Sequence, residues 1–590
     1  MKYFIDLISD EMKTAFVKAG YDETLGRVMV SNRPDLCEYQ CNGAMAGAKK
    51  YGCKPIEIAE NVAKALEGSK VFSSVEAVMP GFLNLKLNNA FLVEYLDGMS
   101  KDPNGKFGLD MPAEPKNIIV DYGGPNVAKP LHVGHLRSAV IGEAVKRICS
   151  YMGHNAIGDI HLGDWGLQMG LVINEIRHRN PELVYFDESF EGEYPTEVPF
   201  TVTDLEEIYP FASGKSKEDP EYKAEAMDAT FKLQNGNRGY RALWQHIMDV
   251  SLADMKKNYD KLNVNFELWN GESTVQYLIP GMLQYLKDNN YTYLSDGAWV
   301  IDVKEDTDKK EMPPCIVIKS DGASLYNTTD LATIMERVEK YDPERMIYLT
   351  DKRQDLYFEQ VFRAARKTKL IDPEVDLVHI GFGTVNGKDG HAFKTREGGV
   401  MRLERLITEI NEKTYERITS AREMPEEEAK EIAKTVALAA IKYGDLSNQA
   451  SKDYIFDMDK FTSFEGDTGP YILYTIVRIK SILSKVEAEG FDIEKASLNG
   501  CYSDAEKTLM MQLVSFNAMM EGAYKDVAPH KVCAFIYELA NDFNKFYHET
   551  KIATEEDINK KGSFIALLKI TKNMLEACID VLGFNAPEKM

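Results

Sequence analysis

Cysteine pairs, long apolar runs and histidine are scarce in this chain of 590 residues, which has 10 histidines and 8 cysteines. Cys37, Cys41 and Cys53 lack C-x-x-C spacing, which argues against the common zinc sites and favours reduced thiols. No apolar run approaches the roughly 18 residues of a membrane-spanning helix. The opening segment, MKYFIDLISDEMK, reaches Asp6 after a few apolar residues and so differs from a secretory signal. We therefore expect a cytoplasmic protein without a protein-held metal.

Basic charge is also in deficit, with 70 Lys and Arg against 93 Asp and Glu and a net charge of −23. This balance argues against a protein that coats nucleic acid over a broad surface, although it leaves room for local basic strips. Two stretches are candidates for such basic strips, but the solvent-exposed face of an ordinary helix would have the same composition. Their basic residues are Arg363, Arg366, Lys367 and Lys369 in the first and Arg478, Lys480 and Lys485 in the second.

The pattern along the chain changes twice, as expected for a chain long enough for three to five domains of about 150 residues. Residues 1–110 mix a helical pattern (55–68) with a strand-like one (81–87), which predicts an α+β module. Residues 111–400 alternate strands and helices, which predicts a doubly wound, mostly parallel Rossmann-like sheet with an acidic insertion near 181–225. Residues 401–590 are amphipathic throughout and predict an α-helical bundle. The strands expected in the sheet region lie within 117–124, 155–166, 315–322, 345–350 and 377–385.

Two of the few histidines stand three residues apart in PNVAKPLHVGH (125–135). The strand expected at 117–121 precedes them, and a helix expected from Leu136 to Met152 follows. His132 and His135 therefore lie beyond the carboxyl end of a strand and at a helix N-terminus, where open α/β sheets bind ligands and phosphate is favoured. We interpret them as a pair of donors for a nucleotide phosphate. The alternative is that they are exposed or capping residues; zinc is disfavoured because H-E-x-x-H is absent.

A second group of polar side chains follows later strands of the same pattern. Tyr326 and Asp330 have the i, i+4 spacing that places them on one helix face, and Gln354 follows the next strand. A carboxylate with a phenol and an amide nearby suits a ligand rich in N–H donors, since a carboxylate can accept two bonds from a guanidinium. After the last strand, the glycine-rich segment 386–399 carries three basic groups and could close over phosphates.

Together and in this order, these segments resemble the class I aminoacyl-tRNA synthetases. HVGH matches the H-x-G-H signature of that class, and the basic segment lies where the class has its K-M-S-K-S loop. Further stretches are similar to the arginyl-tRNA synthetases in particular, and the similarity runs through nearly the whole chain. They are PNVAKPLHVGHLRSA, GDWG (163–166), LYNTTDLA (325–332), FKTREGG (393–399), EGDTGPYILYTIVRIKSI (465–482) and LGFNAPEKM (582–590).

The resemblance implies ATP-dependent ligation of L-arginine to its tRNA through an arginyl-adenylate, for protein synthesis. ATP would be a substrate with Mg²⁺ on its phosphates. His132 and His135 would bind those phosphates and stabilise the transition state, and Gly134 would let the adenine lie close to the backbone. The basic loop departs from the class pattern because a second lysine is missing, and Lys129, upstream of H-x-G-H, fits its role. The ATP-binding residues of the loop would be Lys394, Thr395 and Arg396.

The resemblance also implies an arginine pocket and two tRNA contacts. The pocket would be formed by Asp121, Asn126, His132, Tyr326, Asp330 and Gln354, with Asp330 and Tyr326 on the guanidinium. The module 1–110 would contact the tRNA elbow, and the helices of 401–590 would contact the anticodon. Three alternatives stay open: a class I synthetase for another amino acid, a non-catalytic tRNA-binding relative, and a nucleotidyltransferase acting on a small metabolite.

Overall fold

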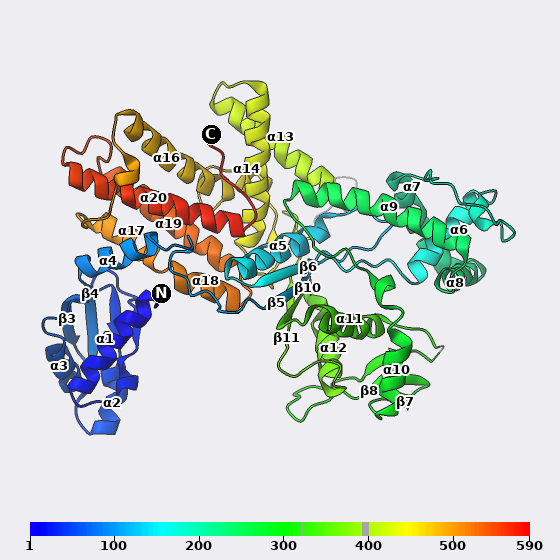
Figure 1. The fold of residues 1–590 in the computed structure, drawn as a ribbon, viewed down its shortest axis with the longest axis horizontal. Coiled ribbons are helices and arrows are strands. Elements are labelled where there is room, and N and C mark those ends of the chain that lie inside the picture. The colour runs from blue at the N-terminus through cyan, green and yellow to red at the C-terminus, as the bar shows by residue number, and fades with distance from the viewer. Residues whose placement is uncertain (321, 392–400) are drawn as a thin grey trace.

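The structure is a computed structural model that describes residues 1–320, 322–391 and 401–590. Figure 1 shows four parts: an N-terminal module, a central parallel sheet, a helical arm beside the sheet and a C-terminal bundle packed over it. In the described part of the chain no helix is both long and apolar enough to cross a bilayer.

The N-terminal module is α+β, as predicted. An antiparallel sheet of four strands, in the order β1-β2-β4-β3, is covered by helices. The expected helix at 55–68 and strand at 81–87 are α3 and β4. The elements are α1 (Phe4–Lys18), η1 (Glu23–Gly26), β1 (Val28–Val30), β2 (Tyr39–Cys41), α2 (Gly43–Tyr51), α3 (Pro55–Ala65), β3 (Phe72–Val78), β4 (Phe82–Leu87) and α4 (Asn89–Ser100).

The central sheet has the order β11-β10-β5-β6, and its four strands are parallel. Its strands are β5 (Asn117–Asp121), β6 (Asn155–Asp159), β10 (Arg345–Asp351) and β11 (Asp376–Phe382), and its helices are α5 (Leu136–Tyr151), α11 (Tyr326–Tyr341) and α12 (Asp355–Lys367). Ile118 and Val120 belong to the core that contains α5, whereas Ile119 belongs to the core that contains α11 and α12. Both faces of the sheet are therefore covered, which confirms the doubly wound prediction.

The expected strand at 315–318 exists but does not join the parallel sheet. It is β9 (Cys315–Ile318), which pairs in a separate antiparallel sheet with β8 (Ala298–Ile301), itself paired with β7 (Tyr293–Ser295). Cys315 and Val317 are buried whereas Ile316 is exposed. This alternation belongs to a sheet with one solvated face, and a short apolar run cannot specify its partner.

The expected insertion near 181–225 is part of a larger helical arm that extends to Lys261. It contains α6 (Leu167–Arg179), η3 (Val184–Phe186), α7 (Val202–Glu218), α8 (Pro220–Gln234) and α9 (Arg238–Lys261), drawn in cyan and green in Figure 1. The chain then returns to the sheet, and residues near Leu268 and Gly271 bridge to Asp159 and Leu162. The next elements are η4 (Glu272–Val275) and α10 (Ile279–Asp288).

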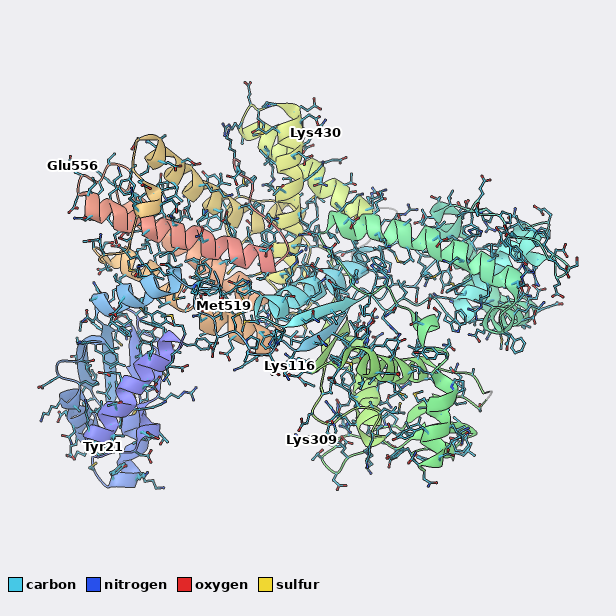
Figure 2. All side chains as sticks on the ribbon, viewed as in Figure 1. Tyr21, Lys116, Lys309, Lys430, Met519 and Glu556 are labelled. Carbon is cyan, nitrogen blue, oxygen red and sulfur yellow. The ribbon has the colours of Figure 1, made fainter. Side chains whose placement is uncertain are left out.

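The C-terminal part is a helical bundle, as predicted, with one short exception. β13 (Tyr454–Ile455) pairs with β12 (Val385–Asn386), which leaves the end of the central sheet. Figure 2 labels Lys430 near the outer end of α14. The helices are α13 (Leu403–Ala421), α14 (Glu426–Leu446), α15 (Met458–Phe461), α16 (Gly469–Ala488), η6 (Ile493–Lys495), α17 (Asp504–Val514), α18 (Phe516–Lys525), α19 (His530–Glu549) and α20 (Ile558–Val581).

The core of the bundle is continuous with the core above the sheet. α5 is buried on nearly all sides, because it contacts the sheet on one side and α14, α18 and α20 on the other. The helix that follows the two histidines is therefore shared between the sheet and the bundle.

Candidate active site

The turn after β5 creates the space for the site. Gly123 and Gly124 have φ values of 91° and 28°, which residues other than glycine rarely adopt. A Cβ atom on Gly123 would also lie 3.0 Å from Phe266. The N–H of Gly123 donates to Oγ of Ser138 at 2.8 Å, which fixes the turn against α5. The chain can then cross the carboxyl end of the sheet and reach the histidines.

The two histidines cap each other. The N–H of Gly134 donates to Nδ1 of His132 at 3.0 Å, and the N–H of His132 donates to Nδ1 of His135 at 3.1 Å. The ring centroids lie 3.9 Å apart, so the imidazoles are neighbours, as their spacing predicts. Because each Nδ1 is an acceptor, a neutral ring carries its proton on Nε2. Both Nδ1 atoms thus act as caps, as the alternative interpretation expects. Both Nε2–H groups remain able to donate to a ligand.

Both rings are neutral at physiological pH. Burial, with smaller contributions from the neighbouring His132 and Lys129, lowers the pKa of His135 to about 3. Burial also lowers the pKa of His132, again with a contribution from Lys129. The pair can therefore offer hydrogen bonds to a phosphate without acting as cations, and the nearby positive charge is that of Lys129.

Gly134 and Lys129 complete this side of the site. A Cβ atom on Gly134 would lie 2.7 Å from Cε1 of His132, so a side chain there would displace the ring. Gly134 is also exposed, which leaves its backbone accessible. The Nζ atom of Lys129 lies 4.0 Å from the ring centre of Tyr209 in α7, and no described carboxylate pairs with it. Its charge is therefore available to a ligand.

Met401 and Leu403, which come after the glycine-rich segment in sequence, contact the residues around the histidines. The N–H of Val133 donates to the carbonyl of Met401 at 3.0 Å, and that of Leu403 donates to the carbonyl of Leu131 at 2.9 Å. Lys388 lies at the other end, where its Nζ is 3.2 Å from Asp457. The predicted ATP-binding residues Lys394, Thr395 and Arg396 lie outside the described residues.

Asp330, in α11, belongs to a cluster of carboxylates with Glu272 and Asp164. It accepts a short hydrogen bond from the phenol of Tyr357, and His161 Nε2 lies 3.8 Å from its carboxylate. Burial raises the pKa of Asp330, so its charge is poorly solvated. Neither ring nitrogen of His161 has a hydrogen-bond partner among the described residues. Tyr357 and His161 were not predicted from the sequence, although His161 lies just after β6 and Tyr357 lies in the first turn of α12.

A second carboxylate, which sequence analysis also missed, lies in the same cluster. Burial, with smaller contributions from the negative charges of Asp164 and Asp330, raises the pKa of Glu272 to about 8. The pKa of Asp164 is itself raised by burial, although it accepts hydrogen bonds from the N–H and hydroxyl of Ser273. Arg337 makes its hydrogen bonds to Asp121 and Asp159, and its charge offsets only part of the effect of burial on Asp330. An unneutralised group of carboxylates of this kind attracts a cationic ligand.

The remaining predicted pocket residues divide into two groups. Asp121 is paired with the protein's own Arg337, whose Nη2 donates to it at 2.6 Å and to Asp159 at 2.8 Å. Asn126 pairs through its backbone with Gly163 of GDWG, and a Cβ atom on Gly163 would lie 2.2 Å from its amide oxygen. Asn126 is therefore locked in place, and its amide makes no side-chain hydrogen bond with described residues.

Tyr326 and Gln354 are both exposed. Tyr326 is 66% exposed and precedes Asp330 by one turn of α11, so both lie on one helix face, as predicted. The phenol that bonds Asp330 is nevertheless that of Tyr357. Gln354 follows β10 in η5 (Lys352–Gln354) and precedes α12. The structure thus brings Asp330 close to His161 and Glu272 and leaves Tyr326 and Gln354 exposed.

Two residues of the candidate basic strips, Arg363 and Lys480, are neutralised by carboxylates. Arg363 makes two hydrogen bonds to Asp308, at 2.8 and 2.9 Å, and Lys480 lies 2.6 Å from Glu588. Arg478 donates to the amide oxygen of Asn544 at 2.5 Å. Arg366 makes no ion pair with a described residue. These stretches therefore resemble solvated helix faces more than a continuous basic strip.

Three family models match the chain. "Arginyl tRNA synthetase N terminal domain" matches residues 2–87, "tRNA synthetases class I (R), catalytic domain" matches 104–458, and "DALR anticodon binding domain" matches 472–590. An arginine–tRNA ligase of Agathobacter rectalis is 61% identical over 598 residues, with both chains covered completely. One from Alkaliphilus oremlandii is 54% identical over 590 residues, again with complete coverage.

Solved structures agree in fold. The arginyl-tRNA synthetase of Plasmodium falciparum superposes over 100% of both chains with a TM-score of 0.81 and 26% identity. That of Thermus thermophilus gives a TM-score of 0.78 at 21% identity, also over 100% of both chains, which supports the fold alone. The three-part architecture is thus shared over the full length.

Proposed function

Because the chain belongs to the class I arginyl-tRNA synthetases and is an arginine–tRNA ligase, we propose that its two polar clusters divide the first step of that reaction. The histidines and Lys129 handle the ATP phosphates, and the acidic pocket holds the arginine guanidinium. The observation that carries this division is the contrast in charge between the clusters. One has neutral donors beside a free ammonium, and the other has desolvated carboxylates.

Adenylate formation is the first chemical step. The arginine carboxylate attacks the α-phosphorus of ATP, an oxygen–phosphorus bond forms, and pyrophosphate leaves with the electrons of the bond that breaks. Negative charge builds on the phosphate oxygens, where the Nε2–H groups of His132 and His135 and the ammonium of Lys129 stabilise it. Gly134 leaves room for the adenine beside the backbone. Mg²⁺ enters with the ATP substrate as the counterion of its phosphates.

The acidic pocket selects arginine. Its guanidinium is planar, permanently charged and able to donate two parallel hydrogen bonds to one carboxylate. We assign Asp330 to that fork, with Glu272 as a second negative partner and Tyr357 fixing the orientation of Asp330. Asn126 and Gln354 face the amino-acid backbone from two strand exits, with Asp121, His132 and Tyr326 at the border.

The second step is transfer to tRNA. A ribose hydroxyl at the tRNA 3′ end attacks the adenylate carbonyl and displaces AMP, which gives arginyl-tRNA. We assign residues 1–110 to the tRNA elbow, 111–400 to catalysis, including Lys394, Thr395 and Arg396 on ATP, and 401–590 to the anticodon. We also place the reaction in the cytoplasm, where translation supplies its substrate and uses its product.

Arginine-dependent exchange of pyrophosphate into ATP tests this assignment. The purified enzyme should catalyse it with arginine and, in a panel of amino acids, with no other at a comparable kcat/KM. The assay is run with and without tRNA. His135→Ala should slow adenylate formation by about 10²–10³-fold, the usual cost of one transition-state donor.

The full-length arginine–tRNA ligase relatives exclude the three alternatives left by the sequence, and the panel provides an independent check of each. Charging with another amino acid would indicate a different synthetase. Binding of tRNA without exchange would indicate a non-catalytic relative, and adenylyl transfer to a small metabolite without tRNA charging would indicate a nucleotidyltransferase. An unchanged single-turnover rate in His135→Ala would remove the histidines from the catalytic role.

A further inference from the structure

Two consecutive buried side chains fix the first turn of α5, which follows His135 directly. Ser138 binds the sheet: its Oγ accepts from the N–H of Gly123 at 2.8 Å and donates to the carbonyl of Leu349 at 3.0 Å. Arg137 is 1% exposed and binds the bundle instead. The turn that carries the histidines is thus held between the two large parts of the molecule.

Arg137 makes four separate attachments, none of them to the sheet below it. Its Nε donates to the carboxylate of Asp445 in α14 at 3.2 Å. Its Nη1 donates to three carbonyls, those of Gly383 at 3.0 Å, Ala450 at 3.0 Å and Lys452 at 2.9 Å. Gly383 lies between β11 and β12, and the other two lie between α14 and β13. One guanidinium therefore joins α5, the strand exit and the bundle.

Asp445 has its own support. It is fully buried, and the hydroxyl of Tyr454 donates to its Oδ2 at 2.8 Å. The Arg137 guanidinium lies 5.1 Å from the ring centre of the same Tyr454. Tyr454 belongs to β13, which pairs with β12. The acceptor and its support both come from the bundle, whereas the donor comes from the helix after H-x-G-H.

A buried ion pair of this kind is a poor source of stability. Removing two charges from water costs about as much as their attraction returns, and apolar replacements are often neutral or stabilising. The pair instead fixes the position of α5, because the planar guanidinium of Arg137 can keep its hydrogen bonds to four acceptors only if it moves very little. His135 ends the turn η2 (Val133–His135), and the N–H of Leu136 closes it onto the carbonyl of Val133. A shift of the first turn of α5 is therefore passed directly to both rings.

We propose that Arg137 is a positioning residue for the histidine pair and that it sets the rings against the bundle through Asp445. The proposal rests on the proposed function, because it requires the Nε2–H groups to meet the phosphate oxygens of the transition state. Such donors act at 2.7–3.1 Å, and a misplacement of about 1 Å costs on the order of 10²-fold in rate. Binding of arginine, which uses the separate acidic pocket, does not depend on this joint.

Asp445→Asn tests the joint, because it keeps the volume and removes the charge that orients Arg137. We expect single-turnover adenylate formation, normalised by active-site titration, to slow by about ten-fold or more, with the Kd for arginine within about two-fold. Tyr454→Phe removes only the support of Asp445 and should cause a smaller loss in the same direction. It also tests the proposal if the first variant fails to fold.

Tyr443→Phe is the matched control in the same helix. Tyr443 is fully buried, and its hydroxyl bonds only within the bundle, to Asp467 at 2.5 Å and to the carbonyl of Cys533 at 3.1 Å. It should lower stability without changing the rate per active site. An Asp445→Asn rate equal to that of the wild type or of this control would overturn the proposal.

A double-mutant cycle with His135→Ala shows whether Arg137 acts through the histidines. With His135 absent, Asp445→Asn should slow the reaction by clearly less than it does alone, since the two changes affect one interaction. Fully multiplicative losses would mean that Arg137 acts by another route and would contradict the proposal. A wild-type rate in His135→Ala alone would instead contradict the proposed function, so the two failures are distinguishable.

Discussion

At the scale of single residues, Asp330 carries the choice of amino acid. Asp330→Asn keeps the shape of the pocket but removes the charge that receives the guanidinium, so the KM for arginine should rise by about 30-fold to 10³-fold. The KM for ATP should change little, because the phosphate cluster is separate. Citrulline, which is neutral, should lose much of its disadvantage against arginine. Steady-state kinetics with both amino acids measure these effects.

Glu339→Gln is the control, since Glu339 is exposed on the same helix α11. It should leave both KM values as in the wild type. If Asp330→Asn were equally silent, Asp330 would be a solubilising residue of α11 and not the partner of the guanidinium.

Glu272 predicts a pH dependence of arginine binding. Its pKa is raised to about 8 in the free protein, so the carboxyl is mostly protonated at pH 7. A bound guanidinium favours the carboxylate, so binding releases a proton and becomes stronger as the pH rises toward 8. The Kd for arginine should fall by up to ten-fold per pH unit between pH 6.5 and 8. Calorimetry in two buffers of different ionisation enthalpy measures both the affinity and the proton release.

Glu272→Gln should flatten this dependence, and its loss of affinity should be larger at pH 8.5 than at pH 6.5. A wild-type Kd that is constant over the same range, or proton uptake on binding, would show that Glu272 does not face the guanidinium.

At the scale of elements, the sequence predicted where helices and strands occur better than it predicted which strands pair with one another. The parallel strands, the helix after HVGH and its end near Gly153 follow from apolar spacing and one glycine with positive φ. The assignment of 315–318 to the same sheet was wrong, because burial of an alternating strand depends on distant partners. Glu272, His161 and Tyr357 escaped notice for the same reason, since they approach Asp330 only after separate segments fold together.

The turn η2 gives a prediction at this scale. Gly134→Ala places a Cβ atom 2.7 Å from Cε1 of His132, so the ring and its Nδ1 cap must move together. Adenylate formation should slow by about ten-fold or more, because the Nε2–H donor leaves its position. Rapid-quench measurement of the first turnover tests this. Gly281→Ala in α10, where an added Cβ meets nothing within 4 Å, should leave the rate unchanged; equal rates in the two variants would refute the argument.

At the scale of the whole molecule, the domains suggested by the sequence are less separate than the changes of pattern imply. α5 packs against both the sheet and the bundle, and Arg137 joins them through a buried pair. The N-terminal module attaches to the bundle chiefly through α4, which packs on α17, and Lys507 of α17 lies 2.6 Å from Glu38. A deletion that keeps α4 therefore leaves this packing in place.

Deletion of residues 1–87 separates tRNA affinity from chemistry. The deletion keeps α4 on α17, removes no described residue of the active site, and should leave the KM values for ATP and arginine within about two-fold. If the module contacts the tRNA elbow, the KM for tRNA should rise and its salt dependence should weaken, because each lost phosphate contact lowers the slope of log K against log salt by about 0.7–0.9. Charging assays from 50 to 200 mM salt measure that slope.

Lys507→Ala is the control for this deletion, because it loosens the attachment but keeps the module. It should lower the melting temperature of the protein and leave the salt slope for tRNA nearly unchanged. The acidic body, with a net charge of −23, makes the slope informative, since few other surfaces can attract phosphate. An unchanged tRNA KM and slope in the deletion variant would place the contacts with tRNA entirely on the sheet domain and the bundle.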